Sequence, residues 1–361
     1  MASGKKNRKE RHWLSHLSFG TVSLVLSGLL VLGYLSVVVN PAKAWIFTLF
    51  GLLYPLVLPL TLGVFIWALV RRSHMRGLLF LVLLPSFFFA GRYFQGGHRT
   101  PSEEGTLKVV SYNVGLFAHG PDGTSRSAMA DSVIRWLRAQ DADLICLQEV
   151  FVPSGESMDA WLRRHFPGYK ANYYVFTGKK GQFGNVTLSR RPVSGKGKIN
   201  FEHSTNLAIW SDIRLEGSTV RIYNCHFESY NISLSGLVKN DGTVEETEKK
   251  MRRSISERPK QVAEVLRGVE SAPVQAVVLG DFNDSPLSYT YFRLLRGRKD
   301  SFAVAGHGLG ATHRALWPLL RIDYILYPPQ LEADTYEVPH VSYSDHYPLI
   351  ATYHETGRNS R

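Results

Sequence analysis

The sequence predicts an α/β domain that is preceded by a membrane-spanning helical region. Long uncharged apolar runs fill most of the first hundred of the 361 residues. From about Gly105 onwards, short strand-like apolar runs alternate with stretches whose apolar residues recur at helical spacing. Strands with helices between them are typical of folds built in layers around a sheet.

Three uncharged apolar runs lie in the N-terminal region, residues 1–100. The first, residues 18–39, holds no charged side chain over 22 residues, and about 20 suffice to cross a bilayer. The second is residues 44–70. The third, 77–94, is shorter and reaches spanning length if Arg92 extends its charge to the interface. We therefore expect three transmembrane helices.

Positive charges flank these runs unevenly. Five Lys and Arg residues precede the first run, and three Arg residues lie within 71–76, against one Lys within 40–43. The positive-inside rule places the N-terminus and residues 71–76 in the cytoplasm. Three spans then put everything after residue 95 on the extracytoplasmic side, which we interpret as that of a bacterial cytoplasmic membrane. If the third run only dips into the membrane, the following domain is cytoplasmic.

A secretory signal peptide is the alternative for the first run. Residues 42–44, Ala-Lys-Ala, resemble a small-x-small cleavage site. The apolar segment of a signal peptide is shorter, however, at about 7–15 residues. Cleavage would not change the side on which the domain lies, because two later runs remain.

The net charge of +12 comes almost entirely from the N-terminal region. Residues 1–100 hold 11 Lys and Arg and one acid, whereas the remaining 261 residues hold 31 basic and 29 acidic side chains. The downstream domain therefore lacks the strong basic excess of duplex-DNA binders. Cys146 and Cys225 lie in apolar strand-like runs and fit neither a disulfide framework nor a zinc site.

The soluble domain is expected over residues 105–354. Its strands are predicted where apolar and β-branched residues gather between turn signals. The predicted strands are 107–114, 144–147, 169–176, 185–188, 207–215, 220–227, 274–279, 322–327 and 347–353.

The helices of this domain are predicted from apolar residues at helical spacing. Met129, Val133 and Leu137 belong to one such series, which predicts a helix over 127–139. Further helices are predicted around 161–166, from near Pro259 to Val269, and over 286–295. Residues 229–257 are polar and charged, and predict an insertion with a solvated helix.

Polar side chains follow or precede six of the apolar strands directly. Mixed α/β sheets tend to build their sites at such strand ends, so we expect these side chains to lie around one pocket. They are Asn113, Glu149, His226, Asp281, Asn283, Asp323, Asp345 and His346.

This set of side chains suits attack of water on a phosphate ester. Carboxylate and amide oxygens are the ligands of Mg²⁺, which also keeps several waters. Such a metal polarises a phosphoryl oxygen, while a second carboxylate activates water. A protonated His stabilises the charge that grows on the phosphate oxygens.

Five motifs in order give a specific resemblance. "SYNVG", "LQEV", "GDFND", "RIDYIL" and "SDHYPL" resemble those of the endonuclease/exonuclease/phosphatase superfamily, which includes DNase I-like nucleases, neutral sphingomyelinases and inositol polyphosphate 5-phosphatases. The resemblance covers residues 105–354. It implies a four-layer sandwich of two mixed β-sheets flanked by helices.

The resemblance also implies a metal site and a base. It makes Glu149 the principal Mg²⁺ ligand, with Asn113 beside it and Asp345 near the metal. It makes Asp281 the residue that orients or deprotonates the attacking water, and Asn283 a contact to the phosphate or the metal. Mn²⁺ is expected to substitute for Mg²⁺. The residue that acts as the base differs across the superfamily, so the set is predicted more firmly than the roles.

The remaining implied residues contact substrate. His346 is implied to donate to the phosphate and to pair with Asp323. His226 is a second phosphate donor; abasic-site nucleases of the superfamily carry Asn there, which argues against that activity. Asn185 and Tyr223 match weaker substrate-binding positions. Five other histidines match no motif and are expected to be structural or on the surface: His119, His203, His307, His313 and His340.

The sequence thus predicts a membrane-anchored, Mg²⁺-dependent phosphoesterase, more specifically a phosphodiesterase. Its partners are the lipid bilayer and a phosphate-ester substrate, and no protein partner is predicted. A lipid phosphate fits the anchor. Alternatives are an extracytoplasmic nuclease, which the near-neutral charge of the domain disfavours, and a catalytically inactive binding or scaffold module.

Overall fold

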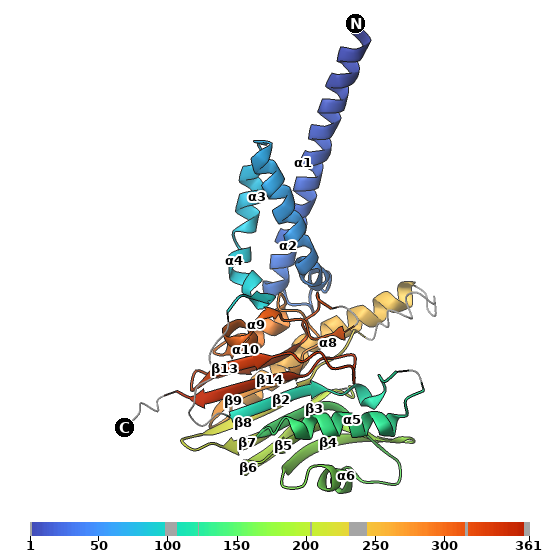
Figure 1. The fold of residues 1–361 in the computed structure, drawn as a ribbon, viewed down its shortest axis with the longest axis vertical. Helices are drawn as coiled ribbons and strands as arrows, with labels where there is room; N and C mark the ends of the chain where they lie inside the picture. Colours follow the sequence, from blue (N-terminus) through green and yellow to red (C-terminus); the bar gives the residue numbers. More distant parts are fainter. Residues whose placement is uncertain are drawn as a thin grey trace. The chain divides into compact units, whose positions relative to one another are not determined.

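The chain divides into two compact units. A computed structural model describes residues 2–97, 107–121, 123–202, 204–230, 244–314 and 317–356. One unit contains Met1–Gly91 and Leu287–Tyr289, and the other contains Arg92–Pro286 and Thr290–Arg361. We call them the helical unit and the catalytic unit (Figure 1).

The helical unit is built from long apolar helices. Helix α1 spans Ala2–Val38 and α2 spans Ile46–Val70. By length and composition, residues 18–38 of α1 and all of α2 are able to cross a membrane. The large apolar side chains that the structure shows as exposed belong, all but three, to residues 22–88. Such side chains are usual where lipid rather than water surrounds a helix.

The third apolar run is divided in the structure. Helix α3 spans Arg76–Leu83, α4 spans Ser86–Phe89, η1 spans Ala90–Arg92 and the short strand β1 spans Phe94–Gln95. Pro85 lies between α3 and α4, where its missing N–H and its ring disfavour a continuous helix. Neither helix reaches the length of the two described candidate spans. The third crossing, and with it the side of the catalytic unit, stays a prediction.

Two six-stranded mixed sheets form the catalytic unit. The first sheet has the order β13-β14-β2-β3-β5-β4 and the second β10-β12-β9-β8-β7-β6. The pairs β2–β3 and β8–β9 are parallel and the other pairs within these sheets are antiparallel. The strands of the first sheet are β2 (Leu107–Asn113), β3 (Leu144–Pro153), β4 (Lys170–Gly178), β5 (Gly181–Ser189), β13 (Leu331–Glu337) and β14 (Leu349–Glu355). Those of the second are β6 (Val193–Asn200), β7 (Leu207–Arg214), β8 (Thr219–His226), β9 (Gln275–Asp281), β10 (Lys299–Asp300) and β12 (Asp323–Tyr327).

Helices cover the outer faces of the two sheets, which confirms the four-layer sandwich. Buried residues of α5 (Arg126–Ala139) and α6 (Met158–His165) pack with one face of the first sheet. Buried residues of α8 (Val244–Glu270) and α9 (Tyr289–Leu295) pack with the outer face of the second. A third apolar cluster fills the space between the sheets. The remaining elements are η2 (Gly115–Phe117), α10 (Ser301–Ala305) and β11 (Gly308–Leu309).

Several predicted elements differ from the structure. Helix α8 contains Pro259 rather than beginning there, and α9 begins at Tyr289 instead of 286. Residues 231–243 of the predicted insertion, and His203, lie outside the described residues. The sequence analysis also missed β6 and β13. In β6, Gly197 replaces an apolar residue, because a Cβ there would lie 2.6 Å from the ring of Trp210.

Buried amide side chains join the two sheets. The Asn224 amide on β8 donates to the backbone carbonyls of Leu147 (3.1 Å) and Val186 (2.9 Å) in the first sheet, and its Oδ1 accepts from Gln148 Nε2 at 2.7 Å. Asn185 on β5 donates to the carbonyls of Leu207 and Asn224 in the second sheet. We call Gln148, Asn185 and Asn224 the amide bridge. It fixes the first sheet against the second next to the strand ends that carry the predicted site.

We expect Asn224→Ala to lower the free energy of unfolding by about 2–4 kcal/mol, because it removes several buried hydrogen bonds at once and leaves Gln148 without its acceptor. Chemical unfolding of the detergent-solubilised chain, followed by tryptophan fluorescence, measures this. The matched control is Asn200→Ala on the exposed edge of β6, which is expected to change stability by less than about 0.5 kcal/mol. Equal effects of the two substitutions would contradict a bridging role.

Candidate active site

The predicted polar residues on five strands face the space between the two sheets. Side chains alternate along a strand, so a residue two positions from a neighbour shares its face. Val109 on β2, and Leu279 on β9 belong to the apolar cluster between the sheets. By this alternation Asn113 and Asp281 lie at the polar end of the same layer. His226 on β8 and Asp323 on β12 follow the same rule.

Strand register places three of these residues side by side in the second sheet. Asp281 at the end of β9 is opposite His226 on β8 and opposite Asp323 on β12. Strand β9 is the centre of this trio because it pairs in parallel with one neighbour and antiparallel with the other. The motifs "GDFND", "NCH" and "RIDYIL" therefore meet across adjacent strands.

A β-bulge turns Glu149 toward this trio. The register of β3 against β5 shifts between Leu147 and Val150, and Glu149 has a φ of 55°. Leu147 and Val150 both pack in the cluster beneath the helices, although they are three residues apart. The bulge thus lets Gln148 and Glu149 both face the second sheet. Bulges often redirect a side chain beside an active site in this way.

The segment after β9 is held in an uncommon backbone conformation. Gly280 has a φ of +117°, and a Cβ there would lie 2.1 Å from the carbonyl oxygen of Cys225, so only glycine fits. Asn283 has a φ of 50°. Its backbone N–H donates to Asp281 Oδ1 at 2.8 Å, and its side-chain amide donates to Asp281 Oδ2 and to the carbonyl of Phe227. Asn283 therefore holds the Asp281 carboxylate.

Four side chains converge at the centre of the site. Asn113 Nδ2 donates to Glu149 Oε1 at 3.1 Å and to Asp281 Oδ2 at 3.0 Å. His226 Nε2 lies 3.4 Å from the same Glu149 oxygen and 3.7 Å from the same Asp281 oxygen. Asp281 is only 1% exposed, whereas the Glu149 side chain is 30% exposed. One carboxylate is thus enclosed by protein and the other is open to solvent.

His346 completes the site from the loop before β14. Its Nδ1 is 2.9 Å from Asp323 Oδ2, and its Nε2 is 3.7 Å from Asp281 Oδ2. Ser344 fixes this loop, since its hydroxyl donates to the carbonyl of Asn113 and accepts from the backbone N–H of His346. Thr312 supports Asp323 by accepting from its backbone N–H. The sequence analysis did not single out Ser344 or Thr312.

Electrostatic interactions within the site favour a protonated His346. Burial disfavours its charged form, but Asp323 and Asp281 outweigh this and raise the pKa of His346 well above its ordinary value. Burial also raises the pKa of Asp281, while the neighbouring His346 acts in the opposite direction. The two residues form a coupled pair in which the carboxylate and the imidazolium stabilise each other.

Two histidines without a motif lie at the rim of the site. His119 Nε2 is 3.4 Å from Asp345 Oδ1, and the ring of His313 lies 5.2 Å from that of His346. Burial opposes ionisation of Asp345, but His346, His119 and His313 outweigh it and lower the pKa of Asp345. Both histidines come from irregular segments, so no strand-end pattern marked them in the sequence.

The structure does not bring Tyr223 or Asn185 into the centre of the site. Tyr223 is three residues from His226 on β8, so it points to the opposite face, where it packs beneath α8. Asn185 is buried in the amide bridge. Asp284, which the sequence analysis interpreted as a helix cap, pairs instead with the buried Arg258, because the helix begins only at Tyr289.

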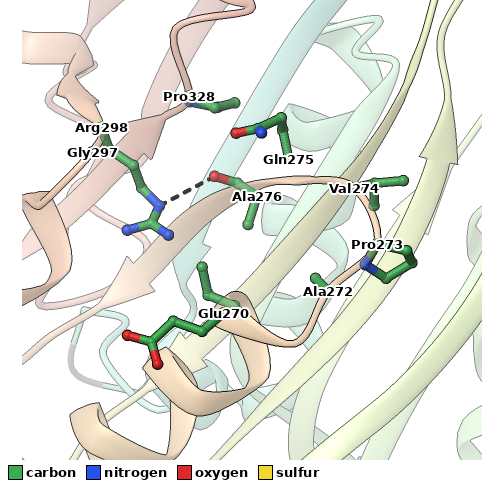
Figure 2. A pocket seen from close by; sticks show the side chains of 10 residues that line it. Glu270, Ala272, Pro273, Val274, Gln275, Ala276, Gly297, Arg298 and Pro328 are labelled. Atoms are coloured by element: carbon green, nitrogen blue, oxygen red, sulfur yellow. Dashed lines mark hydrogen bonds between the residues drawn. The ribbon is translucent and has the colours of Figure 1, made fainter.

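A separate pocket lies at the other end of β9. It is about 230 Å³ and is lined by Gln275 and Ala276 at the start of β9, and by Gly297 and Arg298. Figure 2 shows the Arg298 guanidinium reaching the Ala276 carbonyl, at 3.2 Å. A strand of seven residues is about 20 Å long, so this pocket is remote from Asp281.

Comparison with known proteins identifies the catalytic unit. A model of the endonuclease/exonuclease/phosphatase family matches residues 110–346, well over half of the chain. The chain belongs to this family. Its members are hydrolases of phosphate esters, and so the chain is a phosphoesterase. A domain of unknown function matches residues 16–93, and no curated protein matches the chain.

Solved structures of family members share the fold. An endonuclease/exonuclease/phosphatase from Beutenbergia cavernae is 17% identical, with a TM-score of 0.53; the match covers 71% of this chain and 73% of that one. A family protein from Bacteroides vulgatus is 18% identical, with a TM-score of 0.53 and coverage of 70% and 100%. The catalytic domain of human Nocturnin with bound sulfate anion is 17% identical, with a TM-score of 0.52 and coverage of 70% and 95%.

The site suits the divalent metal that the family generally uses. Two carboxylates, of Glu149 and Asp281, approach one amide nitrogen and one imidazole nitrogen. A cation compensates such converging negative charge. Mg²⁺ is held by one or two carboxylates and keeps several waters, which fits a ligand that is partly exposed, as Glu149 is. Two further groups, His313–Asp345–His346 and Asp281–Asp323–His346, bring potential ligand atoms within 4.8 Å of one another.

We expect Asp323→Asn to move the alkaline limb of the activity profile to lower pH. The change removes the largest positive influence on the pKa of His346, so this residue loses its proton earlier as the pH rises. The same pair stabilises the fold fully below the pKa of an unfolded His, about 6.5, and this contribution is lost as the pH rises through the raised pKa. Measuring kcat/KM against pH tests the shift.

The control for this experiment is Asp334→Asn. Asp334 also contacts a histidine, since His354 Nδ1 lies 2.8 Å from its Oδ1, but the pair is outside the site. An unchanged alkaline limb in Asp323→Asn, or an equal shift in both variants, would contradict the pairing of His346 with Asp323 in catalysis.

Proposed function

We propose that the chain is a membrane-anchored, Mg²⁺-dependent phosphodiesterase that hydrolyses a lipid or lipid-linked phosphate at the membrane surface. The observation that carries this proposal is the convergence of Glu149, Asp281, His226 and His346 at one end of the layer between the sheets. The group combines an exposed carboxylate, a buried carboxylate and two imidazoles. That is the set needed to activate water beside a phosphate ester.

The residues of the chain divide the work as follows. Asp281, held by Asn283 and Asn113, accepts a proton from the attacking water. His346, kept protonated by Asp323, donates a hydrogen bond to a phosphate oxygen, and His226 donates a second. Mg²⁺, when bound by Glu149 with Asn113 and Asp345 nearby, polarises the phosphoryl oxygen.

The lipid substrate is supported by the helical unit. Residues 18–38 and α2 have the length and composition of membrane spans, and their large apolar side chains are widely exposed. An anchor of this kind holds the site close to headgroups. The near-neutral charge of residues 101–361, with 31 basic and 29 acidic side chains, gives no electrostatic support for a nucleic acid.

Metal removal tests the proposed cofactor. We expect EDTA to abolish hydrolysis and either Mg²⁺ or Mn²⁺ to restore it, because both ions take carboxylate oxygens as ligands. The assay is release of p-nitrophenol from bis-p-nitrophenyl phosphate by the detergent-solubilised chain. Full activity after EDTA treatment and dialysis would contradict the carboxylate assignments.

A substrate panel tests the rest of the proposal. It contains sphingomyelin, phosphatidylinositol phosphates, an undecaprenyl-type diphosphate and plasmid DNA, with Asp281→Ala as the inactive control. Hydrolysis of a lipid, dependent on Asp281, is the expected result. Nicking of plasmid alone would favour a nuclease, and no hydrolysis of any compound would favour a binding or scaffold module.

A further inference from the structure

Three large apolar side chains are exposed on the described part of the catalytic unit. They are Phe94 (58% exposed), Leu309 (47%) and Trp317 (48%). Elsewhere the described exposed side chains of this size belong to the helical unit, residues 22–88. Single exposed apolar residues are common on soluble proteins, but these three are neighbours, and a contiguous apolar patch marks an interaction surface.

The three residues form one patch, which we call the apolar rim. Phe94 on β1 is opposite Leu309 on β11 in an antiparallel pair. Leu309 and Trp317 line the same hollow of about 370 Å³, together with Phe302 and His340. The Trp317 ring packs edge-on against His340, with ring centres 5.6 Å apart. The rim is therefore apolar at its surface, with imidazole groups beside it.

The chain that leaves the helical unit is fixed to this rim. The carbonyl of Arg92 accepts from the buried Arg321 at 3.0 Å, and the carbonyl of Tyr93 accepts from Gly310 N at 3.2 Å. The Gly97 carbonyl lies 3.1 Å from His307 Nδ1. Residues 92–97 are thus part of the catalytic unit, not a free linker.

Chain length then limits how far the rim can lie from the membrane. The helical unit ends at Gly91, three residues before Phe94. Three residues span at most about 10 Å. Phe94 and its partner Leu309 therefore stay within about this reach of the last residue of the helical unit, in whatever way the two units are arranged. A bilayer that holds the helices also has its interface near the rim.

We propose that the apolar rim is a membrane-contact surface, on which Phe94, Leu309 and Trp317 enter the boundary between headgroups and acyl chains. This inference rests on the membrane anchoring in the proposed function. Trp is enriched at this boundary because its ring is apolar and its N–H is polar. The continuity of the rim with the chain leaving the helices favours lipid over any other occupant.

The rim also connects to the catalytic histidine. His340 stacks on Tyr347, with ring centres 4.5 Å apart, and Tyr347 follows His346 in sequence. A row of three rings, Trp317–His340–Tyr347, leads from the rim toward the site. Contact with the bilayer through the rim therefore places headgroup phosphates, rather than dissolved esters, on the approach to His346.

Site-directed labelling of the full chain tests this proposal. Cys146 and Cys225 are buried, so a single introduced thiol can be labelled selectively. Leu309→Cys and Trp317→Cys receive an environment-sensitive fluorophore, and the chain is reconstituted in nanodiscs of phosphatidylethanolamine and phosphatidylglycerol. Lys196→Cys, on the exposed edge strand β6, is the matched control. Quenching is measured with doxyl-labelled lipid and with aqueous iodide.

We expect the labels at 309 and 317 to be quenched by doxyl lipid and shielded from iodide, and the label at 196 to show the reverse. Quenching of all three by iodide alone would overturn the proposal. Shielding from both quenchers, with crosslinks between chains through the thiol at 309, would also overturn it and identify a second copy as the occupant. Loss of the unsubstituted chain from carbonate-washed membranes would refute the anchoring itself. Hydrolysis of bis-p-nitrophenyl phosphate, scored in the same samples, tests the catalytic proposal independently.

Discussion

Asp281→Asn is expected to reduce kcat for phosphodiester hydrolysis by about 10³-fold, the typical contribution of a positioned general base. The Asp281 carboxylate is enclosed, accepts hydrogen bonds from Asn113 and Asn283, and lies 3.7 Å from His346 Nε2. An amide at this position neither accepts a proton from water nor stabilises the imidazolium. Its N–H groups also face the donor N–H groups of Asn113 and Asn283, so the arrangement of the site is disturbed as well.

The control for Asp281→Asn is Asp212→Asn on β7 of the same sheet. Asp212 accepts two hydrogen bonds from Arg221, at 2.7 and 2.8 Å, away from the site. We expect this variant to keep the kcat of the unsubstituted chain. A kcat in Asp281→Asn within tenfold of the unsubstituted chain would exclude Asp281 as the main base. Thermal unfolding of both variants separates loss of catalysis from loss of folding.

Glu149→Gln is the second substitution for which we expect a large effect. Residues that only support a metal ligand cost about 10–100-fold in affinity or activity, so loss of the principal ligand should cost on the order of 10²-fold or more. Both the affinity for Mg²⁺ and kcat are expected to fall. Folding should be preserved, because the side chain is partly exposed and its removal relieves the approach of two carboxylates.

Binding of Mn²⁺, measured by electron paramagnetic resonance, gives a readout for Glu149→Gln that does not depend on activity. The matched control is Glu156→Gln, which only breaks a surface pair with Arg164. Unchanged Mn²⁺ binding in Glu149→Gln would remove Glu149 as the principal ligand. Lost binding with unchanged hydrolysis would contradict the proposed metal dependence.

The fold and most of the polar site could be predicted because each strand that carries a polar group is an uninterrupted apolar run. Val274 to Leu279 followed by Asp281 is one such case, and the structure places Asp281 at the end of β9. Strands β6 and β13 escaped prediction for the opposite reason. Lys and Ser alternate with Gly in β6, and Asp and Thr interrupt β13, so neither shows an apolar run.

The direction of single side chains was harder to predict than their place in the sequence. An uninterrupted β3 would turn Glu149 toward the helices, and nothing in "LQEV" announces the bulge. His119 and His313 reach the rim of the site from irregular segments, whose paths depend on tertiary packing. Tyr223 is different: its odd separation from His226 already placed it on the opposite face of β8, and this alternation was available in the sequence.

The pairing of the last strand with the first has a consequence for biosynthesis. Strand β14 lies between β2 and β13, so the centre of the first sheet is completed only when the C-terminal strand has been made. The ribosome releases the helical region more than two hundred residues earlier, and this region can insert into a membrane while the rest of the chain is still being translated. The loop that carries His346 arrives with β14. We therefore expect an anchored but inactive nascent chain, in which catalytic competence is acquired only after synthesis ends.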